Sequence, residues 1–129
     1  MSAFEPAVLE AIGREREVEL TTWGRKSGNP SRVIIWIFRN GDRVFIRSGG
    51  GLGRDWPRNL IARGKAVLNV AGHDVAVTGT HVEDPALARH VSSLAIEKYQ
   101  SNVQRSTGDE ELTPGESATF ELFPDDANA

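Results

Sequence analysis

A run of β-branched and aromatic residues between positions 32 and 39 constrains the fold of this chain more than any other segment. The segment Arg32–Arg39 reads RVIIWIFR, and most of its side chains favour a strand. Because the apolar residues are continuous rather than alternating, we expect a central strand that is covered on both faces. Asn40-Gly41 then predicts a tight hairpin into Val44–Ile46. The fold must therefore be built around an antiparallel sheet.

Shorter strand and helix signals surround this hairpin. Further strands are predicted at Val18–Thr22, Lys65–Val70, Asp74–Val82 and Ala118–Phe123, and the second and third of these are expected to form a hairpin around Ala71-Gly72-His73. Helices are predicted from Phe4 to Ile12 with Gly13 as the end, from Trp56 to Ala62 with Asp55 as N-cap, and from Asp84-Pro85 past Tyr99. Residues 107–116 are expected to form a loop, and the tail after Pro124 to be disordered. Six strands in meander order with peripheral helices indicate a mainly β (α+β) fold, a small closed or half-open barrel formed by one domain over residues 1–129.

Composition excludes several classes of protein. The chain contains no cysteine, so disulfides, thiolate metal sites and cysteine nucleophiles are ruled out. No apolar run approaches the roughly 20 residues of a membrane span, and no secretory signal is visible, so we expect a cytoplasmic protein with no membrane span. The isoelectric point of about 5.6 argues against a dedicated nucleic-acid binder.

Positive charge is concentrated in one third of this acidic chain. Residues 25–65 contain ten Lys or Arg and two acids, whereas the whole chain has a formal net charge of −3. Within this stretch, the segment Thr21–Arg32 places three cations and a hydroxyl around glycines that can turn backbone N–H groups toward a ligand. A compact anion such as phosphate suits this turn, although a solvated basic hairpin tip would have the same composition.

A second candidate feature is the glycine loop Ser48–Arg54, which reads SGGGLGR. Its glycines allow a flat ligand to approach the backbone closely, and the helix expected after it directs its N-terminal donors toward the loop. The spacing matches neither a dinucleotide-binding fingerprint nor a phosphate loop. A flexible surface loop is the alternative interpretation.

The order of these motifs resembles the deazaflavin-dependent nitroreductase family, within the flavin and deazaflavin oxidoreductase superfamily. The resemblance rests on TTWGRKSG followed by Arg32, an apolar strand, a GDR hairpin, a strand ending in SGGG, and the segment Trp56–Leu60, read as WPRNL. It covers Val18 to Val82. It implies a homodimeric split β-barrel that binds coenzyme F420, with FMN as the alternative cofactor that the same superfamily uses.

The resemblance also implies a role for individual residues. Those expected to hold the phosphate are Arg25, Lys26, Ser27, Gly28 and Arg32. Those expected around the deazaflavin ring are Ser48, Gly49, Gly50, Gly51, Trp36, Trp56 and Asn59, with core packing as the alternative role of each tryptophan. Arg58 is also expected to bind the cofactor. Ser48 and Tyr99 are the candidate catalytic residues: Ser48 would bond the reactive edge of the ring, and Tyr99 would donate a proton or form a substrate wall.

The implied activity is hydride transfer from reduced F420 to a small organic acceptor. Such a cofactor carries the difficult chemistry, which fits the lack of a nucleophile triad or paired carboxylates in the sequence. His73, His81 and His90 are interpreted as structural or solvated, and no metal site is expected. An FMN-dependent oxidoreductase, or a non-catalytic protein that binds a cofactor or another anionic ligand, remains the alternative. No nucleic-acid partner is expected.

Overall fold

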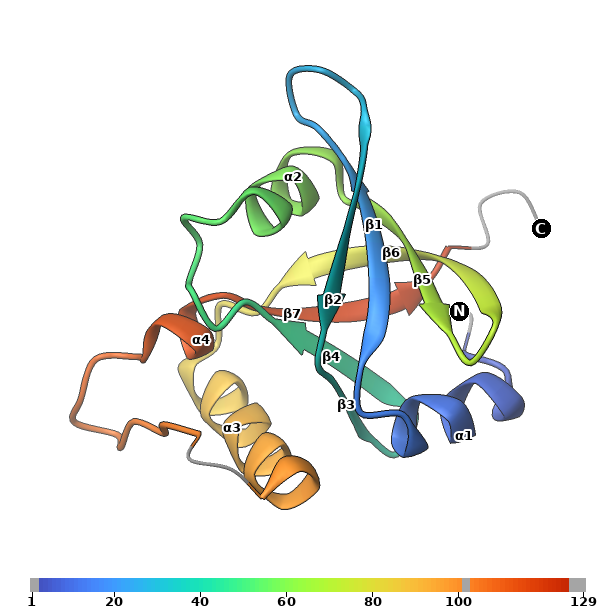
Figure 1. Cartoon of the computed structure of the whole chain (residues 1–129). Helices are drawn as coiled ribbons and strands as arrows, with labels where there is room; N and C mark the ends of the chain where they lie inside the picture. Colours follow the sequence, from blue (N-terminus) through green and yellow to red (C-terminus); the bar gives the residue numbers. More distant parts are fainter. Residues whose placement is uncertain (1–2, 101–102, 126–129) are drawn as a thin grey trace.

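The computed structural model of the chain describes residues 3–100 and 103–125, and within them seven strands and four helices form a mixed α+β fold (Figure 1). The strands are β1 (Val18–Trp23), β2 (Pro30–Ile35), β3 (Ile37–Asn40), β4 (Arg43–Arg47), β5 (Lys65–Val70), β6 (His73–His81) and β7 (Thr119–Pro124). The helices are α1 (Pro6–Arg14), α2 (Asp55–Arg63), α3 (Pro85–Tyr99) and α4 (Pro114–Ser117). Most of the tail expected to be disordered, residues 126–129, lies outside the described residues.

The strands form one antiparallel sheet in the order β2-β1-β5-β6-β7-β4-β3. Its two edge strands, β2 and β3, are consecutive in the chain and are separated only by Trp36. The sheet therefore curls until its opposite edges approach each other at this single residue, as the curved ribbon shows (Figure 1). This half-barrel with helices around it confirms the predicted fold class.

The prediction of a central strand over residues 32–39 was wrong. This segment bends at Trp36, so that β2 pairs with β1 and β3 pairs with β4 at opposite edges of the sheet. Ile35 and Ile37 point into the barrel, whereas Ile34 and Trp36 on the other face remain 62% and 37% exposed. One face of this run packs in the core, and the other is apolar although it is partly exposed. The sequence therefore looks like that of a strand buried on both faces.

Several smaller predictions also need correction. The sheet has seven strands rather than six, and β7 pairs with both β4 and β6, so the order is not a meander. α1 continues through Gly13 to Arg14, and the N-cap of α2 is Arg54 rather than Asp55. The predicted loop at residues 107–116 includes the start of α4, which a capping box between Thr113 and Glu116 stabilises.

The turn predictions agree with the structure. A two-residue turn that includes Gly41, with φ +62°, joins β3 to β4, and Ala71-Gly72 joins β5 to β6 with φ above zero at both positions. These are the conformations that favour tight hairpins.

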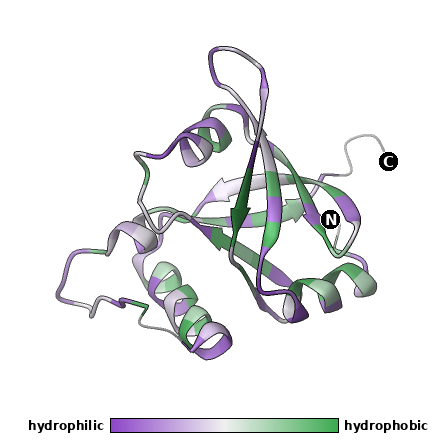
Figure 2. Cartoon of the chain, in the orientation of Figure 1, coloured by the Kyte–Doolittle hydropathy of each residue, from purple (hydrophilic) through white to green (hydrophobic). Residues whose placement is uncertain are grey.

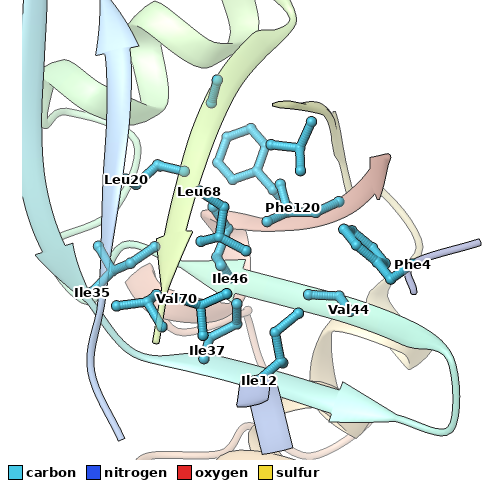
Figure 3. Close-up of a cluster of buried hydrophobic side chains, with 14 of the residues drawn as sticks. Phe4, Ile12, Leu20, Ile35, Ile37, Val44, Ile46, Leu68, Val70 and Phe120 are labelled. Carbon is cyan, nitrogen blue, oxygen red and sulfur yellow. The ribbon is translucent and has the colours of Figure 1, made fainter. Parts of the chain in front are cut away.

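Two clusters of buried side chains hold the fold together. The larger one fills the barrel and includes Leu20, Ile37, Ile46, Leu68 and Phe120, none of them more than 1% exposed, and α1 packs on it (Figure 3). The smaller one lies between α3 and the outer face of β3 and β4. Figure 2 shows the apolar stripes of the barrel strands and the more polar tip of the β1–β2 hairpin, which extends beyond the barrel beside α2. No helix in the described ranges is long and apolar enough to cross a bilayer.

Candidate functional site

A cleft of about 890 Å³ opens beside the bend at Trp36. Its walls come from β2, the glycine loop after β4, the start of α2, Ala95 of α3, and residues 103–104 and 113–115. The volume lies in the range of sites that enclose most of a drug-sized ligand. The bend in the strand thus provides the concave surface that a straight central strand would not.

Five of the residues predicted from the sequence line this cleft: Trp36, Ser48, Gly49, Gly50 and Trp56. Trp36 is partly exposed, whereas Trp56 is 8% exposed and packs against Phe120, with ring centroids 5.8 Å apart. The glycine loop and both tryptophans therefore come together although they lie on different elements.

The backbone of the glycine loop is open to a ligand on one side. A Cβ placed on Gly49 would meet no atom within 4 Å, so the backbone there borders free space. Gly51 has φ +84° and packs against Pro114, and Gly51 N–H donates to the carbonyl of Ser48 at 3.0 Å. Ser48 is 5% exposed, and its own N–H donates to Ala118 of the neighbouring chain segment. The loop is therefore anchored from behind and accessible from the cleft.

The predicted phosphate turn forms the tip of the β1–β2 hairpin, but its residues do not line the cleft. Gly28 has φ +72°, and its N–H donates to the carbonyl of Gly24 at 2.9 Å. The Ser27 hydroxyl accepts from the N–H of Asn29 at 3.1 Å, so it stabilises the turn itself. Lys26 is exposed at the tip. These hydrogen bonds preorganise the turn, and Lys26 is the more exposed of its two cations.

Arg25 and Asn59 connect this turn to α2. The buried amide oxygen of Asn59 accepts from the backbone N–H of Arg25 at 3.1 Å and from its guanidinium at 2.9 Å. Arg25 also lies 3.6 Å from the carboxylate of Asp55, which lines the cleft. Two predicted ligand residues therefore contact each other and fix the basic turn at the edge of the cleft.

Two further predicted cations stay on the surface outside the cleft lining. Arg32 is 4.0 Å from Glu19, and Arg58 is exposed on α2. The surface position of each leaves its side chain able to move toward a bound anion, but the structure brings neither to the glycine loop.

Tyr99 lies behind Trp36 rather than in the cleft lining. Its ring stacks on Trp36 with centroids 4.0 Å apart, and the residue is 4% exposed. The hydroxyl accepts from the N–H of Ile37 at 3.0 Å and lies 2.7 Å from the carbonyl of Arg16. Burial raises the pKa of Tyr99 above its ordinary value. This arrangement gives Tyr99 a positioning role in which it fixes the bend and supports the exposed tryptophan.

Sequence reasoning missed two arginines that line the cleft. Arg54 lies directly over Gly50, where an added Cβ would overlap its guanidinium. Arg47 is largely buried, and its guanidinium donates to the Ser92 hydroxyl at 2.8 Å and to the Ala88 carbonyl at 2.9 Å. Both belong to the cationic stretch over residues 25–65, and this charge count was the only signal that could have found them.

A buried carboxylate lies behind Arg47 at this end of the cleft and reaches it through the Ser92 hydroxyl. Glu116 is fully buried and accepts hydrogen bonds from Ser92, Ser106 and the N–H of Thr113. Burial alone would raise the pKa of Glu116, but these hydrogen bonds outweigh it and lower the pKa to about 2. Burial lowers the pKa of Arg47 to about 10, so both groups are charged at neutral pH.

Comparisons with solved structures place this fold among known ones. An F420-H2 dependent reductase, FDR-A, has 22% identity and a TM-score of 0.64, with 84% of this chain and 95% of that chain covered. The heme storage protein HutZ from Vibrio cholerae has 17% identity and a TM-score of 0.67, with 96% and 92% covered. A structure described as a domain-swapped dimer has 20% identity and a TM-score of 0.63, with 84% and 81% covered. The likeness to F420-dependent reductases predicted from the sequence is thus confirmed for the fold.

The proteins that share this fold differ in what they bind, so the fold alone assigns no activity. A search of curated proteins finds no match. A family model described as an uncharacterised protein conserved in bacteria, DUF2255, matches residues 8–122, which is most of the chain. The chain therefore belongs to the DUF2255 family.

Proposed function

We propose that this protein is an oxidoreductase that uses reduced coenzyme F420 to reduce a small organic acceptor. One observation carries the proposal: a single cleft joins the open glycine backbone to Trp36, and α2, whose first residues form part of the wall, holds the preorganised basic turn just outside the cleft through Asn59 and Arg25. A cofactor with a flat ring at one end and a phosphate at the other needs these two surfaces in this order. The likeness in fold to FDR-A supports the same choice.

The ring of the cofactor would lie in the cleft against the glycine loop. The open side of Gly49 allows a planar group to contact the backbone, and the Ser48 hydroxyl can hydrogen-bond to the ring edge. Trp36 provides an exposed apolar surface that Tyr99 holds in place from behind. These residues would bind the ring, orient it and exclude water from one of its faces.

The phosphate would lie at the basic turn. Lys26 and Arg32 provide exposed charge, and Gly28 shapes the turn. Arg25 contributes charge but also holds the turn on α2 through Asn59, so it would act partly as a positioning residue. Arg58, on the exposed face of α2, would add to the same positive field.

When bound in its reduced form, F420 supplies a hydride to the acceptor, and a proton completes the reduction. An enone or a nitroaromatic compound is an acceptor of this kind. Ser48 belongs to the lining of the cleft, whereas Tyr99 lies outside it and its hydroxyl is engaged by backbone groups. We therefore assign orientation to Ser48 and take solvent as the source of the proton.

A titration of the purified protein with oxidised F420 and, separately, with FMN tests this proposal. We expect F420 to bind with a change in its fluorescence and FMN to bind much more weakly. Preferential binding of FMN would identify the protein as a flavin-dependent relative, and binding of neither would contradict a redox function. Consumption of reduced F420 in the presence of nitroaromatic or enone acceptors then tests the reaction itself.

The double variant Arg25→Ala with Lys26→Ala tests the location of the phosphate. Each lost charge-assisted contact should cost about 1.5 to 3 kcal/mol, so we expect F420 affinity to fall by at least tenfold while the fold is retained. The matched control is Arg14→Ala with Lys65→Ala, which changes the net charge equally at sites outside the cleft. Equal affinities of the two double variants would place the phosphate elsewhere.

We also propose that the protein is a homodimer. Strand β2 is at the edge of the sheet and exposes Ile34, and the same strand lines the cleft. A second copy on this edge would cover the apolar side chain and narrow the open side of the cleft.

A further inference from the structure

We propose that Arg47 and Arg54 form a second anion-binding subsite in the cleft, separate from the basic turn, which takes the carboxylate of a planar aromatic acceptor. The proposal rests on the proposed function only where it calls this ligand the acceptor. The subsite itself is a property of the cleft and can be tested without any cofactor.

Arg54 is the exposed half of the subsite. It lines the cleft, and its exposed guanidinium lies against Gly50 of the glycine loop. Among the residues in the described ranges, no carboxylate pairs with Arg54. Arg54 is also the N-cap of α2 and provides no side-chain cap, so the first N–H groups of this nine-residue helix add positive potential to the same end of the cleft.

Arg47 is the buried half of the subsite. Its two terminal nitrogens are used by Ser92 and Ala88, but within the described part of the chain its buried Nε–H has no acceptor. The nearest counter-charge, Glu116, is reached through the Ser92 hydroxyl rather than by a direct ion pair. A buried donor without an acceptor is costly, so Arg47 would gain by turning its Nε–H toward an oxyanion bound in the cleft.

The two arginines flank the same short piece of backbone. A Cβ on Gly115 would lie 3.5 Å from Cδ of Arg47 and 3.9 Å from Cα of Gly49. Arg54 covers the next residue, Gly50. A small anion over Gly49-Gly50 would therefore lie beside the Arg54 guanidinium and close to the Arg47 side chain, with the open backbone beneath it.

Trp36 determines which anions fit. The β3–β4 ladder ends at the pair Ile37–Ile46, and Trp36 and Arg47, the residues that follow on each side of this pair, both line the cleft. The stack on Tyr99 holds the Trp36 ring as a flat wall beside the guanidinium. An aromatic ring on this wall would direct a carboxylate substituent toward the two arginines.

The acids of the cleft lining favour one orientation of such a ligand. Glu17 precedes Val18, whose register partner is Ile35, so Glu17 lies on the β1 side of Trp36, whereas Arg47 lies on the β4 side. Asp55 also lines the cleft but is paired with Arg25 at 3.6 Å. The carboxylate of the ligand should therefore point toward β4 and the glycine loop and away from Glu17.

Calorimetric titration of the cofactor-free protein with 2-naphthoate and with 2-naphthamide tests the subsite. The two probes share a planar ring and differ mainly in charge. We expect the wild type to prefer naphthoate by about tenfold and Arg54→Gln to remove most of this preference, because a charge-assisted contact is lost. Arg14→Gln, which removes the same charge from α1, should leave the preference unchanged. Trp36→Leu should weaken both probes alike, because both use the wall.

Arg47→Lys keeps the charge but removes the unpartnered Nε–H, and we expect it to weaken naphthoate binding selectively. Circular dichroism establishes that each variant is folded. Equal affinities of naphthoate and naphthamide for the wild type, or equal effects of Arg54→Gln and Arg14→Gln, would overturn the proposal. A protein that prefers naphthoate but binds neither F420 nor FMN would retain the subsite and lose the proposed redox function. A protein that binds F420 or FMN but shows no preference for naphthoate would retain the proposed redox function and lose the subsite.

Discussion

Glu116 shows how one buried residue supports a large part of the cleft. Its carboxylate accepts hydrogen bonds from Ser92 on α3, from Ser106 and from the N–H of Thr113 at the start of α4. The Ser92 hydroxyl in turn accepts a hydrogen bond from Arg47 on β4. A buried charge is unfavourable unless several donors satisfy it, and here hydroxyl and backbone donors do so. The charge of Glu116 therefore contributes directly to folding stability.

We expect Glu116→Gln to destabilise the protein at pH 7 by about 3 kcal/mol, which is the linkage value for a pKa lowered from 4.5 to about 2. Because the pKa in the folded state lies below that in the unfolded state, this contribution is complete above about pH 4.5 and is lost as the pH falls toward 2. Urea unfolding at pH 7, 4 and 3 measures the difference between the wild type and the variant. That difference should shrink as the pH falls.

The control for this prediction is Glu10→Gln. The Glu10 side chain is 80% exposed, and its removal should change the unfolding free energy by less than about 0.5 kcal/mol at any of these pH values. A Glu116→Gln effect that is equally large at pH 3 and pH 7 would mean that packing, rather than charge, is responsible.

At the scale of residues, composition predicted the parts of the site that depend on backbone and failed for those that depend on side-chain direction. Gly49 and Gly50 were singled out because a run of glycines carries its own signal, whereas Trp36 was placed at the cofactor only by the family resemblance. Arg47 and Arg54 were not distinguished from the other cations, because only the fold turns these two toward the cleft. Tyr99 was predicted on the correct helix, but a sequence cannot show that its hydroxyl is bonded to the backbone of Ile37.

At the scale of elements, hairpins were predictable and pairings between distant strands were not. The turns after Asn40 and Val70 were found because Gly41 and Gly72 act within a few residues. The pairing of β7 with both β4 and β6, and the placement of β2 and β3 at opposite edges, depend on contacts between residues far apart in the sequence. No local pattern in the run from Arg32 to Arg39 indicates that the strand bends at Trp36.

Helix α2 depends on a close contact that only glycine allows. A Cβ on Gly79 of β6 would lie 2.7 to 2.9 Å from three side-chain carbons of Leu60, which is fully buried. The N–H of Gly79 also donates to the carbonyl of Gly64, the left-handed residue that ends α2, at 3.0 Å. Because α2 carries Asn59, this contact also determines where the basic turn is held.

We expect Gly79→Ala to lower the free energy of unfolding by about 1 to 3 kcal/mol, the usual cost of overpacking a filled core. Urea denaturation measures the change. Gly53→Ala is the matched control, because a Cβ there meets no atom within 4 Å and its stability should hardly change. The double variant Leu60→Ala with Gly79→Ala should lose less stability than the sum of the losses of the two single variants. Full additivity would show that the clash with Leu60 is not the cause.

At the scale of the whole molecule, the sheet closes around its core and leaves one edge incompletely covered. The bend at Trp36 brings β2 and β3 together, but the free side of β2 has no strand beside it in the described chain. Ile34 on this strand lines the cleft and is 62% exposed. The surface that would bind a second copy and the surface that would bind the ligand therefore share residues, so dimer formation and ligand affinity should be linked.

Sedimentation velocity at micromolar concentration tests this relation, and we expect the wild type to sediment as a dimer. Ile34→Glu places a charge on the apolar edge and should shift the protein toward the monomer, because burial of an unpaired carboxylate opposes association. Ile61→Glu is the matched control: Ile61 is 53% exposed on α2 and does not line the cleft, so this variant should remain dimeric. If association narrows the cleft, Ile34→Glu should also bind F420 more weakly at low protein concentration, with the loss diminishing as the concentration rises. A wild type that is monomeric throughout, or an Ile61→Glu variant that dissociates as readily as Ile34→Glu, would show that β2 is not the interface.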